Sequence, residues 1–312
     1  MVVDNKATVT YVQLLKEDLL IMRIVPKDGP VPDFEAGQFL TLGLSNPLDG
    51  GKIVRRAYSI ASHPENKEYI EFVIRWVRKP LPGRLTTQIF NVKEGDEILW
   101  LKPTGKALGI SQELASGEKD TRRIVCIGGG TGLAPFVSFA QHLHDTNDKR
   151  EIVVLHGASY VDELSYKDLL TGLEDDTNDK REIVVLHGAS YVDELSYKDL
   201  LTNLEDESIA KGKDVWNFKY RAAISRPQEW FNRSWAGQVG RVETFLRPRD
   251  NGMSPLEELI GDKVTQKNTI FYVCGWQGTI DGVMDFLKPK GFITEHDKRE
   301  DGSFEVKYES YG

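Results

Sequence analysis

A glycine-rich turn near the middle of the chain is the segment best suited to bind a ligand. The apolar run 124–130 (IVCIGGG) leads directly into residues 131–135 (TGLAP) and a helical stretch. Glycines at a strand-to-helix turn let the backbone approach a pyrophosphate, and the helix N-terminus supplies N–H donors and positive potential. Glycine-rich turns without a ligand are also common, so the turn by itself leaves both interpretations open.

A second candidate site is the run Arg56-Ala57-Tyr58-Ser59, in a segment with the character of a strand. An arginine can bind a phosphate through two parallel N–H groups. Because a strand presents alternate residues on one face, Arg56 and Tyr58 are expected to project together, with Ser59 on the other side. The alternative is an ordinary barrel strand that carries a solvated arginine.

The elements that must position these residues fall into two groups. The first hundred residues hold short strand-like runs separated by turn clusters, which predicts a small antiparallel β-barrel over residues 1–110. After the polar stretch 111–122, apolar strand-like runs alternate with helical ones. This pattern predicts an α/β domain with a doubly wound parallel sheet over residues 120–312.

A near-perfect tandem repeat interrupts the second domain. Residues 145–175 recur as residues 176–206, and the only change is Gly172 to Asn203. One unit is a strand plus a helix, and two copies are too few for a solenoid. An added strand would shift the following strands by ~4.8 Å, whereas extruding one copy costs only ~1–2 kcal/mol of loop closure. We therefore expect one copy in the sheet and the other extruded.

Charge and cysteine content exclude several classes of protein. The net charge is −8, but each repeat copy holds eight acidic and three basic residues, so most of the acidity belongs to the duplication. Nothing indicates a nucleic-acid partner. Cys126 and Cys274 lie in strand-like runs, and two cysteines by themselves form neither a zinc site nor a disulfide framework. Without a signal peptide or an apolar run of ~18 residues, the expectation is a soluble, cytoplasmic protein with no membrane partner.

Six motifs occur in an order that is more specific than any one of them: AGQF (36–39), RAYS (56–59), GRLTT (83–87), KPTG (102–105), GTGLAP (130–135) and Cys274-Gly275. Together they resemble the ferredoxin–NADP reductase family in its bacterial, FAD-dependent form, from about residue 8 to residue 312. The spacing from Gly130 to Cys274 is 144 residues, longer than in that family, and removing one copy leaves 113. The repeat is thus an insertion into an otherwise regular member.

The resemblance implies an FAD site in the barrel. Arg56 would hold the FAD pyrophosphate, Tyr58 would lie along the flavin and ribityl chain, and Ser59 would hydrogen-bond near flavin N5. Thr86 and Thr87 match the positions that grip the FAD phosphates at a helix start. The remaining members of the implied site are Ala57, Ile74, Gly83 and Leu85.

The resemblance also implies a nicotinamide site in the second domain, at Gly130, Thr131, Gly132, Cys274 and Gly275. Thr131 would lie beside both cofactors, and Cys274 beside the nicotinamide C4, where a small thiol lets the ring slide against the flavin. The alternative for Cys274 is a buried structural cysteine.

The C-terminus carries a third implied element. Tyr311 would cover the nicotinamide face of the flavin, which makes Ser59, Cys274 and Tyr311 the implied catalytic set. Gly312 stands where relatives have a tryptophan, and Tyr308 is the substitute if Tyr311 does not stack.

Coenzyme choice is expected to depend on charge near the adenosine ribose. Ser225-Arg226 resembles a pair that binds the 2′-phosphate of NADP(H), and Arg241 resembles a second arginine with the same task. Two arginines and a hydroxyl suit a dianion, so NADPH is favoured over NADH. The alternative is two solvated surface arginines. Ser159 and Ser190 stand where a further arginine would be expected.

Two further features of the sequence predict neither a proton-transfer residue nor a metal site. Ile280 occupies the position of a glutamate found in plant-type relatives, so proton handling cannot be transferred from them. His142 and His144 are two residues apart on a predicted helix, on different faces, and are expected to be solvated rather than to bind a metal.

The resemblance implies transfer of electrons between NADPH and ferredoxin or flavodoxin through FAD. Residues 75–84 (RWVRKPLPGR) carry four positive charges and no acid, which suits an acidic partner protein or an ordinary solvated hairpin. Two alternatives remain: a flavin reductase or oxygenase reductase component, and a flavin-binding subunit without turnover.

Overall fold

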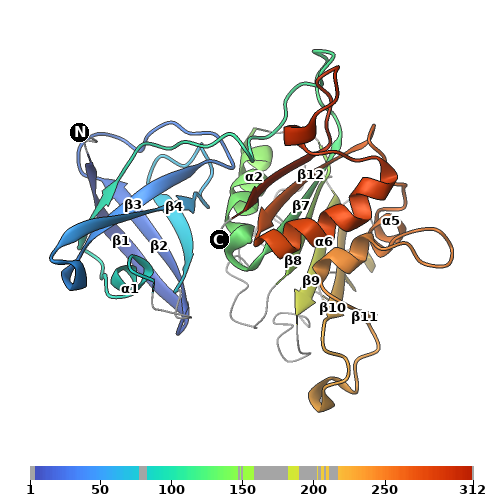
Figure 1. Ribbon diagram of the computed structural model, residues 1–312, viewed down its shortest axis with the longest axis horizontal. Coiled ribbons are helices and arrows are strands. Elements are labelled where there is room, and N and C mark those ends of the chain that lie inside the picture. Colours follow the sequence, from blue (N-terminus) through green and yellow to red (C-terminus); the bar gives the residue numbers. More distant parts are fainter. Residues whose placement is uncertain are drawn as a thin grey trace. The chain divides into compact units, whose positions relative to one another are not determined.

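The chain folds into two compact units. The computed structural model describes residues 4–76, 83–146, 148, 150–157, 182–189 and 217–310, together with positions 202, 205, 206, 209 and 210. One unit comprises Met1–Ile110 with Ala134–Asn147, and the other comprises Ser111–Leu133 with Asp148–Gly312 (Figure 1). Among the described residues, no helix has both the length and the apolar character needed to cross a membrane.

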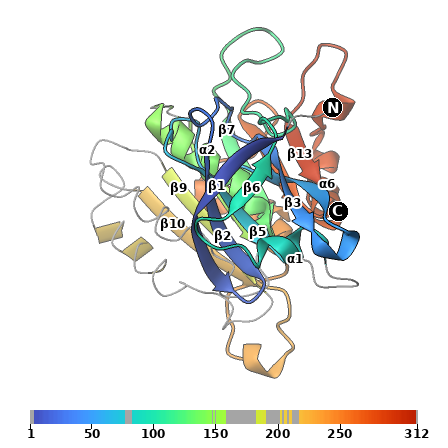
Figure 2. The same cartoon turned by 90° about the vertical axis from the view of Figure 1, so that its left-hand side faces the viewer.

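The first unit contains an antiparallel sheet of six described strands. They are β1 (Asn5–Lys16), β2 (Leu19–Pro26), β3 (Phe39–Asn46), β4 (Lys52–Ser59), β5 (Ile70–Arg75) and β6 (Glu97–Trp100), in the order β4-β3-β6-β1-β2-β5. In Figure 2 these strands curve around a common interior, which is filled by apolar side chains such as those of Met22, Leu40 and Phe72. Next to the two edge strands, Ala61 N–H, just after β4, donates to the Glu71 carbonyl oxygen of β5 at 2.8 Å. The predicted antiparallel barrel is confirmed.

Two helices accompany this sheet, α1 (Thr86–Ile89) and α2 (Ala134–Asp145), with the short 3₁₀ helix η1 (Pro47–Asp49). Sequence analysis placed α2 in the second domain, but α2 groups with the first unit. The reason is close packing at Gly37. Its φ is +91°, and a Cβ there would lie 2.8 Å from the Phe139 ring and 2.4 Å from Leu108 O. Only glycine fits between that backbone and α2.

The second unit contains a parallel sheet of seven described strands. They are β7 (Arg123–Gly129), β8 (Ile152–Gly157), β9 (Glu182–Ala189), β10 (Asn217–Ile224), β11 (Gln238–Val239), β12 (Thr269–Gly275) and β13 (Val306–Ser310), in the order β11-β10-β9-β8-β7-β12-β13. Every residue of β12 is buried, as expected for a strand covered on both faces. The parallel, doubly wound sheet predicted from the sequence is confirmed.

The helices described in this unit are short apart from α6. They are α5 (Pro255–Ile260), α6 (Gln277–Leu287) and the 3₁₀ helices η2 (Gly130–Leu133), η5 (Trp230–Asn232), η6 (Val242–Leu246), η7 (Lys288–Lys290) and η8 (Glu295–Asp297). Helix α6 follows β12 directly and buries Ile280, Val283 and Leu287.

The tandem repeat is built into the sheet twice, so the expected extrusion of one copy is wrong. β8 and β9 are parallel neighbours and pair in register, with Val153 opposite Val184 and Leu155 opposite Leu186. All four side chains are fully buried. Burying one large aliphatic side chain contributes ~1.5–3 kcal/mol, and extrusion of the second copy would forgo this contribution for both Val184 and Leu186. Joining also pairs backbone groups that extrusion would leave as an exposed edge.

Candidate functional site

The parallel sheet has its topological switch point between β7 and β12. From β7 the chain proceeds to β8 on one side, while β12 lies against the other side of β7. In open α/β sheets, ligands bind at the carboxyl ends of the strands at such a point. Here those ends carry the glycine-rich turn 128–133 and the pair Cys274-Gly275, so both sequence-predicted segments lie at one place.

The glycine-rich turn leaves no room for side chains on its inner side. A Cβ on Gly128 would lie 2.9 Å from Gly132 O, and one on Gly129 would lie 3.2 Å from Thr279 Oγ1. Gly130 has φ +57°, and a Cβ there would meet nothing within 4 Å. The turn therefore packs tightly against the start of α6 and presents bare backbone outward, which fits the pyrophosphate of a dinucleotide.

Cys274 is fully buried at the end of β12. Its register partners are Gly128 on β7 and Glu309 on β13. Because in-register residues of parallel strands project to the same face, the thiol and the Glu309 carboxyl share one face beside the switch point. Cys126, in contrast, lies within β7, where burial raises the pKa of its thiol well above the ordinary value.

Glu309 is a candidate functional residue of this site that sequence analysis did not single out. Burial raises the pKa of its carboxyl above the ordinary value of 4.5. The position examined in the sequence for an acid, Ile280, is instead buried in the apolar core. The missed signal was the strand run at 306–310, since its pairing with β12 brings the acid next to Cys274.

Replacing Glu309 with glutamine is expected to stabilise the fold at pH 7–8 and to change it little near pH 4. A raised folded-state pKa gives a contribution to stability that is complete below 4.5 and is lost as the pH rises through the folded-state pKa. Melting temperatures of the wild type and Glu309→Gln across this range measure the effect, with Glu300→Gln at an exposed position as the control. A difference that does not vary with pH would contradict the assignment.

The arginines expected to recognise a 2′-phosphate lie together. Ser225 and Arg226 follow β10, Arg241 follows β11, and these two strands pair in parallel. Gly240 N–H donates to Ile224 O at 2.8 Å, which fixes the second segment against the first. The Arg241 side chain is 63% exposed and lies 3.4 Å from a carboxylate oxygen of Glu243.

Their distance from the switch point differs from the expectation, however. Both β8 and β9 separate β10 from β7. A single copy of the repeat would leave one intervening strand, so the second copy moves the arginines by ~4.8 Å across the sheet.

In the first unit, β4 holds Arg56, Ala57, Tyr58 and Ser59, and Arg56 and Ala57 are exposed. The Tyr58 hydroxyl is buried and has no hydrogen-bond partner among the described residues. Burial raises the pKa of this phenol, and the Arg56 charge partly opposes the rise, which puts the two side chains near each other. A buried hydroxyl without a partner is costly unless a ligand satisfies it, so this strand fits the predicted FAD contact.

The start of α1 offers fewer hydrogen-bond donors for the FAD phosphates than the sequence predicted. Thr87 N–H already donates to Gly83 O at 3.0 Å, and the Thr87 hydroxyl accepts a hydrogen bond from Trp76 Nε1 at 3.0 Å. The hydroxyl hydrogen is therefore what Thr87 could offer to a phosphate. Leu85 and Thr86 are buried. Ile74 packs its side chain into the barrel core, which leaves only its backbone for a cofactor.

Several predicted residues lie outside the described residues: Tyr311, Gly312, Ser159, Ser190 and the stretch 77–82 of the basic segment. Two others have partners. The ring of Tyr308 packs edge-on against His296 at 5.2 Å, and Arg84 forms an ion pair with Asp49. His142 was expected to be solvated, but its Nδ1 lies 2.8 Å from Glu65 Oε1. That expectation is wrong because the loop after β4 reaches α2.

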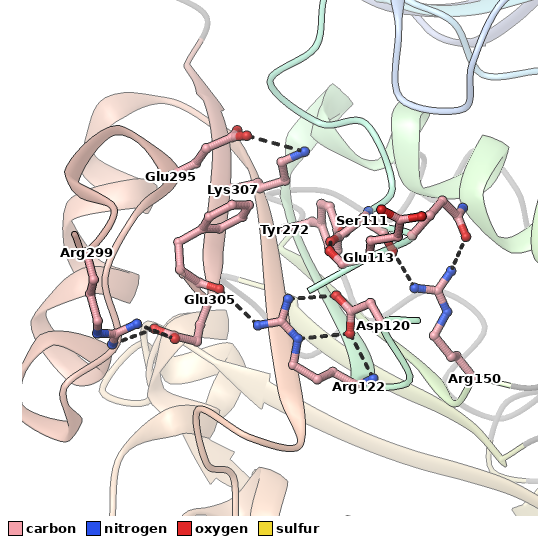
Figure 3. Close-up of polar contacts among 12 residues, drawn as sticks. Ser111, Glu113, Asp120, Arg122, Arg150, Tyr272, Glu295, Arg299, Glu305 and Lys307 are labelled. Atoms are coloured by element: carbon pink, nitrogen blue, oxygen red, sulfur yellow. Dashed lines mark hydrogen bonds and ion pairs between the residues drawn. The ribbon is translucent and has the colours of Figure 1, made fainter. Parts of the chain in front are cut away.

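A group of buried charges lies at the opposite end of the sheet, just before β7 and β8, and Figure 3 shows its contacts. Asp120 and Arg122 form a bidentate ion pair just before β7, and Arg122 Nη1 donates to Phe304 O at 2.9 Å. Arg150, just before β8, donates to Ser111 O at 2.6 Å. Since ligands bind at carboxyl ends, we assign these residues a structural role.

Comparison with known proteins agrees with this architecture. Residues 6–108 match the oxidoreductase FAD-binding domain, and residues 126–178 match the oxidoreductase NAD-binding domain. A ferredoxin–NADP reductase from Azotobacter vinelandii is 37% identical over 144 residues, which is 46% of this chain and 51% of that protein. The reductase component of propane 2-monooxygenase from Mycolicibacterium goodii is 29% identical over 53% of this chain and 43% of its own length.

The solved structures include a ferredoxin NADP⁺ reductase from Neisseria gonorrhoeae with bound FAD and NADP. It aligns over 99% of both chains with a TM-score of 0.61 and 18% identity, a likeness that shows the fold. The chain spans about half the length of the curated relatives it matches.

The two sheets and the two matched domains define a two-domain oxidoreductase with an FAD-binding and a nicotinamide-nucleotide-binding part. These matches agree with the resemblance to the ferredoxin–NADP reductase family that the six motifs indicate.

Proposed function

We propose that the chain is a flavoprotein reductase that passes electrons between NADPH and ferredoxin or flavodoxin, with one FAD per chain. The observation that carries the proposal is the switch point, where a turn that only glycine can form lies beside Cys274-Gly275. The A. vinelandii relative supports the choice of partner, because it is named for this reaction. We place the activity in the cytoplasm, where two buried cysteines outside any disulfide stay reduced.

The protein's own groups have distinct tasks in this proposal. Arg56 binds the FAD pyrophosphate, and the Tyr58 hydroxyl gains the hydrogen bond that it lacks. The backbone of the turn 128–133 binds the dinucleotide, and the small Cys274 side chain leaves space beside the nicotinamide. When bound, FAD supplies hydride acceptance from the nicotinamide and release of the electrons one at a time. Ser59 and Tyr311 complete the proposed catalytic set.

The proposal is tested on the purified chain after incubation with FAD. We expect one non-covalent FAD per chain, measured by chromatography of the released flavin, and steady-state oxidation of NADPH with ferricyanide. A chain that binds no flavin would refute the proposal. Flavin binding without turnover would identify a flavin-binding subunit instead.

Replacing Arg56 with alanine is expected to weaken FAD binding by ~1.5–3 kcal/mol, the scale of one charge-assisted contact. Titration of the flavin-free chain with FAD, followed by flavin fluorescence, measures the loss. The neighbouring Arg55, which pairs with Asp4, gives the matched control Arg55→Ala, for which we expect near-wild-type affinity. Equal losses in the two variants would show that Arg56 has no special role.

The second candidate function is that of an oxygenase reductase component, which the M. goodii relative favours. The two functions differ in the electron acceptor. A panel of ferredoxins, flavodoxins and free flavins, assayed with the same NADPH-dependent chain, separates them.

A further inference from the structure

Four potential metal ligands gather in the first unit, apart from the proposed cofactor residues. His63 and Glu65 lie in the loop after β4, while His142 and Asp145 lie in the last turn of α2. One ligand atom from each of His63, Glu65 and Asp145 lies within 4.8 Å of the other two. His142 joins the group through its contact with Glu65.

The two segments present their ligands in matching pairs. His63 Nε2 lies 2.9 Å from Asp145 Oδ2, and His142 Nδ1 lies 2.8 Å from Glu65 Oε1. Positions 142 and 145 are three residues apart, so they share one face of α2. Pro64 fixes the backbone between the two loop ligands. The cluster is therefore formed by segments that are far apart in sequence.

The orientation of His63 determines which ring nitrogen faces the cluster. Its Nδ1 atom is buried and has no hydrogen-bond partner among the described residues. The ring therefore engages its surroundings through Nε2, the nitrogen directed at the cluster. The four side chains are 17–36% exposed, so an ion can reach them from solvent.

The donor set determines which ion would suit it. Two imidazoles and two carboxylates form a mixed nitrogen and oxygen set of the kind that zinc binds with tetrahedral geometry. Imidazole disfavours Mg²⁺ and Ca²⁺, which take oxygen ligands. Two carboxylates also match the charge of one divalent ion, and such an ion would replace the two contacts between the histidines and the carboxylates.

We propose that His63, Glu65, His142 and Asp145 bind one divalent transition-metal ion, with Zn²⁺ as the probe. The ion joins the loop that follows Arg56–Ser59 to the helix that begins where the glycine-rich turn ends. Its expected role is structural, because it ties the loop after β4 to α2. The proposal does not depend on the redox activity proposed above.

The test uses the full-length chain with bound FAD. Metal ions are removed with EDTA, the EDTA is removed by dialysis, and the chain is then titrated with Zn²⁺ in a calorimeter. We expect one Zn²⁺ per chain and a raised melting temperature, since a ligand that binds only the folded state stabilises it. Mg²⁺ at the same concentrations is expected to give neither effect.

Variants decide whether these four residues hold the ion. We expect His63→Gln and His142→Gln each to weaken Zn²⁺ binding by at least about tenfold. The matched control is His296→Gln, an exposed histidine of the second unit, which should bind Zn²⁺ as the wild type does. Absence of stoichiometric binding, or binding that persists in the double variant His63→Gln/His142→Gln, would overturn the proposal.

Discussion

Deleting residues 176–206 is expected to strengthen NADPH binding by at least about 100-fold while changing NADH binding little. With β8 and β9 both in the sheet, Arg226 after β10 lies ~14 Å across the sheet from β7, and Arg241 after β11 lies ~19 Å from it. With one copy, β10 pairs with β8, and the two separations fall to ~10 Å and ~14 Å. Two restored contacts of ~1.5–3 kcal/mol each account for a change of this size, because tenfold corresponds to ~1.4 kcal/mol.

The duplication supplies its own control. Deleting residues 145–175 instead leaves the same sequence except for Asn203 in place of Gly172, so the two deletions should behave alike. Dissociation constants for NADP⁺ and NAD⁺, measured by calorimetry, report the coenzyme preference without requiring turnover.

Arg226→Ala tests whether the distance of Arg226 from the coenzyme is the cause. The substitution is made in the full chain and in the chain that lacks residues 176–206. We expect it to change NADP⁺ affinity by less than about twofold in the full chain and by about tenfold or more after the deletion. An equal loss in both backgrounds would show that the additional strand does not separate Arg226 from the coenzyme.

The sequence predicted the two sheets because their patterns are local. Short runs with frequent turns predicted the antiparallel strands, and fully apolar runs such as β12 predicted strands buried on both faces. The place of the second repeat copy could not be predicted in the same way. Both outcomes satisfy the local pattern, and the choice depends on whether Val184 and Leu186 find neighbours to bury them. The NAD-binding match ends at residue 178, as the second copy begins.

Those parts of the candidate site that are contiguous in sequence could be predicted. Those parts that form only when distant segments pair in the fold were missed. The run Arg56–Ser59 and the turn 128–133 are contiguous, so their motifs identify them. Glu309 becomes notable only through its register with Cys274. The sequence could not show the contact of His142, because its partner, Glu65, is 77 residues away in sequence.

Asp120 and Arg122 illustrate the same limit. In the sequence they belong to the polar stretch 111–122, after which the pattern of the second domain begins. In the structure Asp120 is fully buried, and three groups of Arg122 bond to its carboxylate. Burial alone would raise the pKa of Asp120, but the hydrogen bonds from Arg122 outweigh burial and hold that pKa below its ordinary value. The carboxylate is therefore charged at neutral pH.

Replacing Arg122 with methionine is expected to lower the free energy of unfolding by about 3–5 kcal/mol at pH 7, because the Asp120 carboxylate is then buried without a partner. Denaturant unfolding of the isolated chain measures the loss. Lys6→Ala removes one half of an exposed ion pair with Glu97 and should leave stability nearly unchanged.

The double variant Asp120→Leu/Arg122→Met separates the two sources of that loss. If the unpaired charge is the main cost, the double variant should recover most of the stability that Arg122→Met loses, since apolar residues often replace a buried ion pair without penalty. Acidification should also lessen the loss in Arg122→Met, because protonation removes the stranded charge. If the double variant is as unstable as the single one, the main contribution of Arg122 is instead its bond to Phe304 O, which ties the start of β7 to the segment that leads into β13.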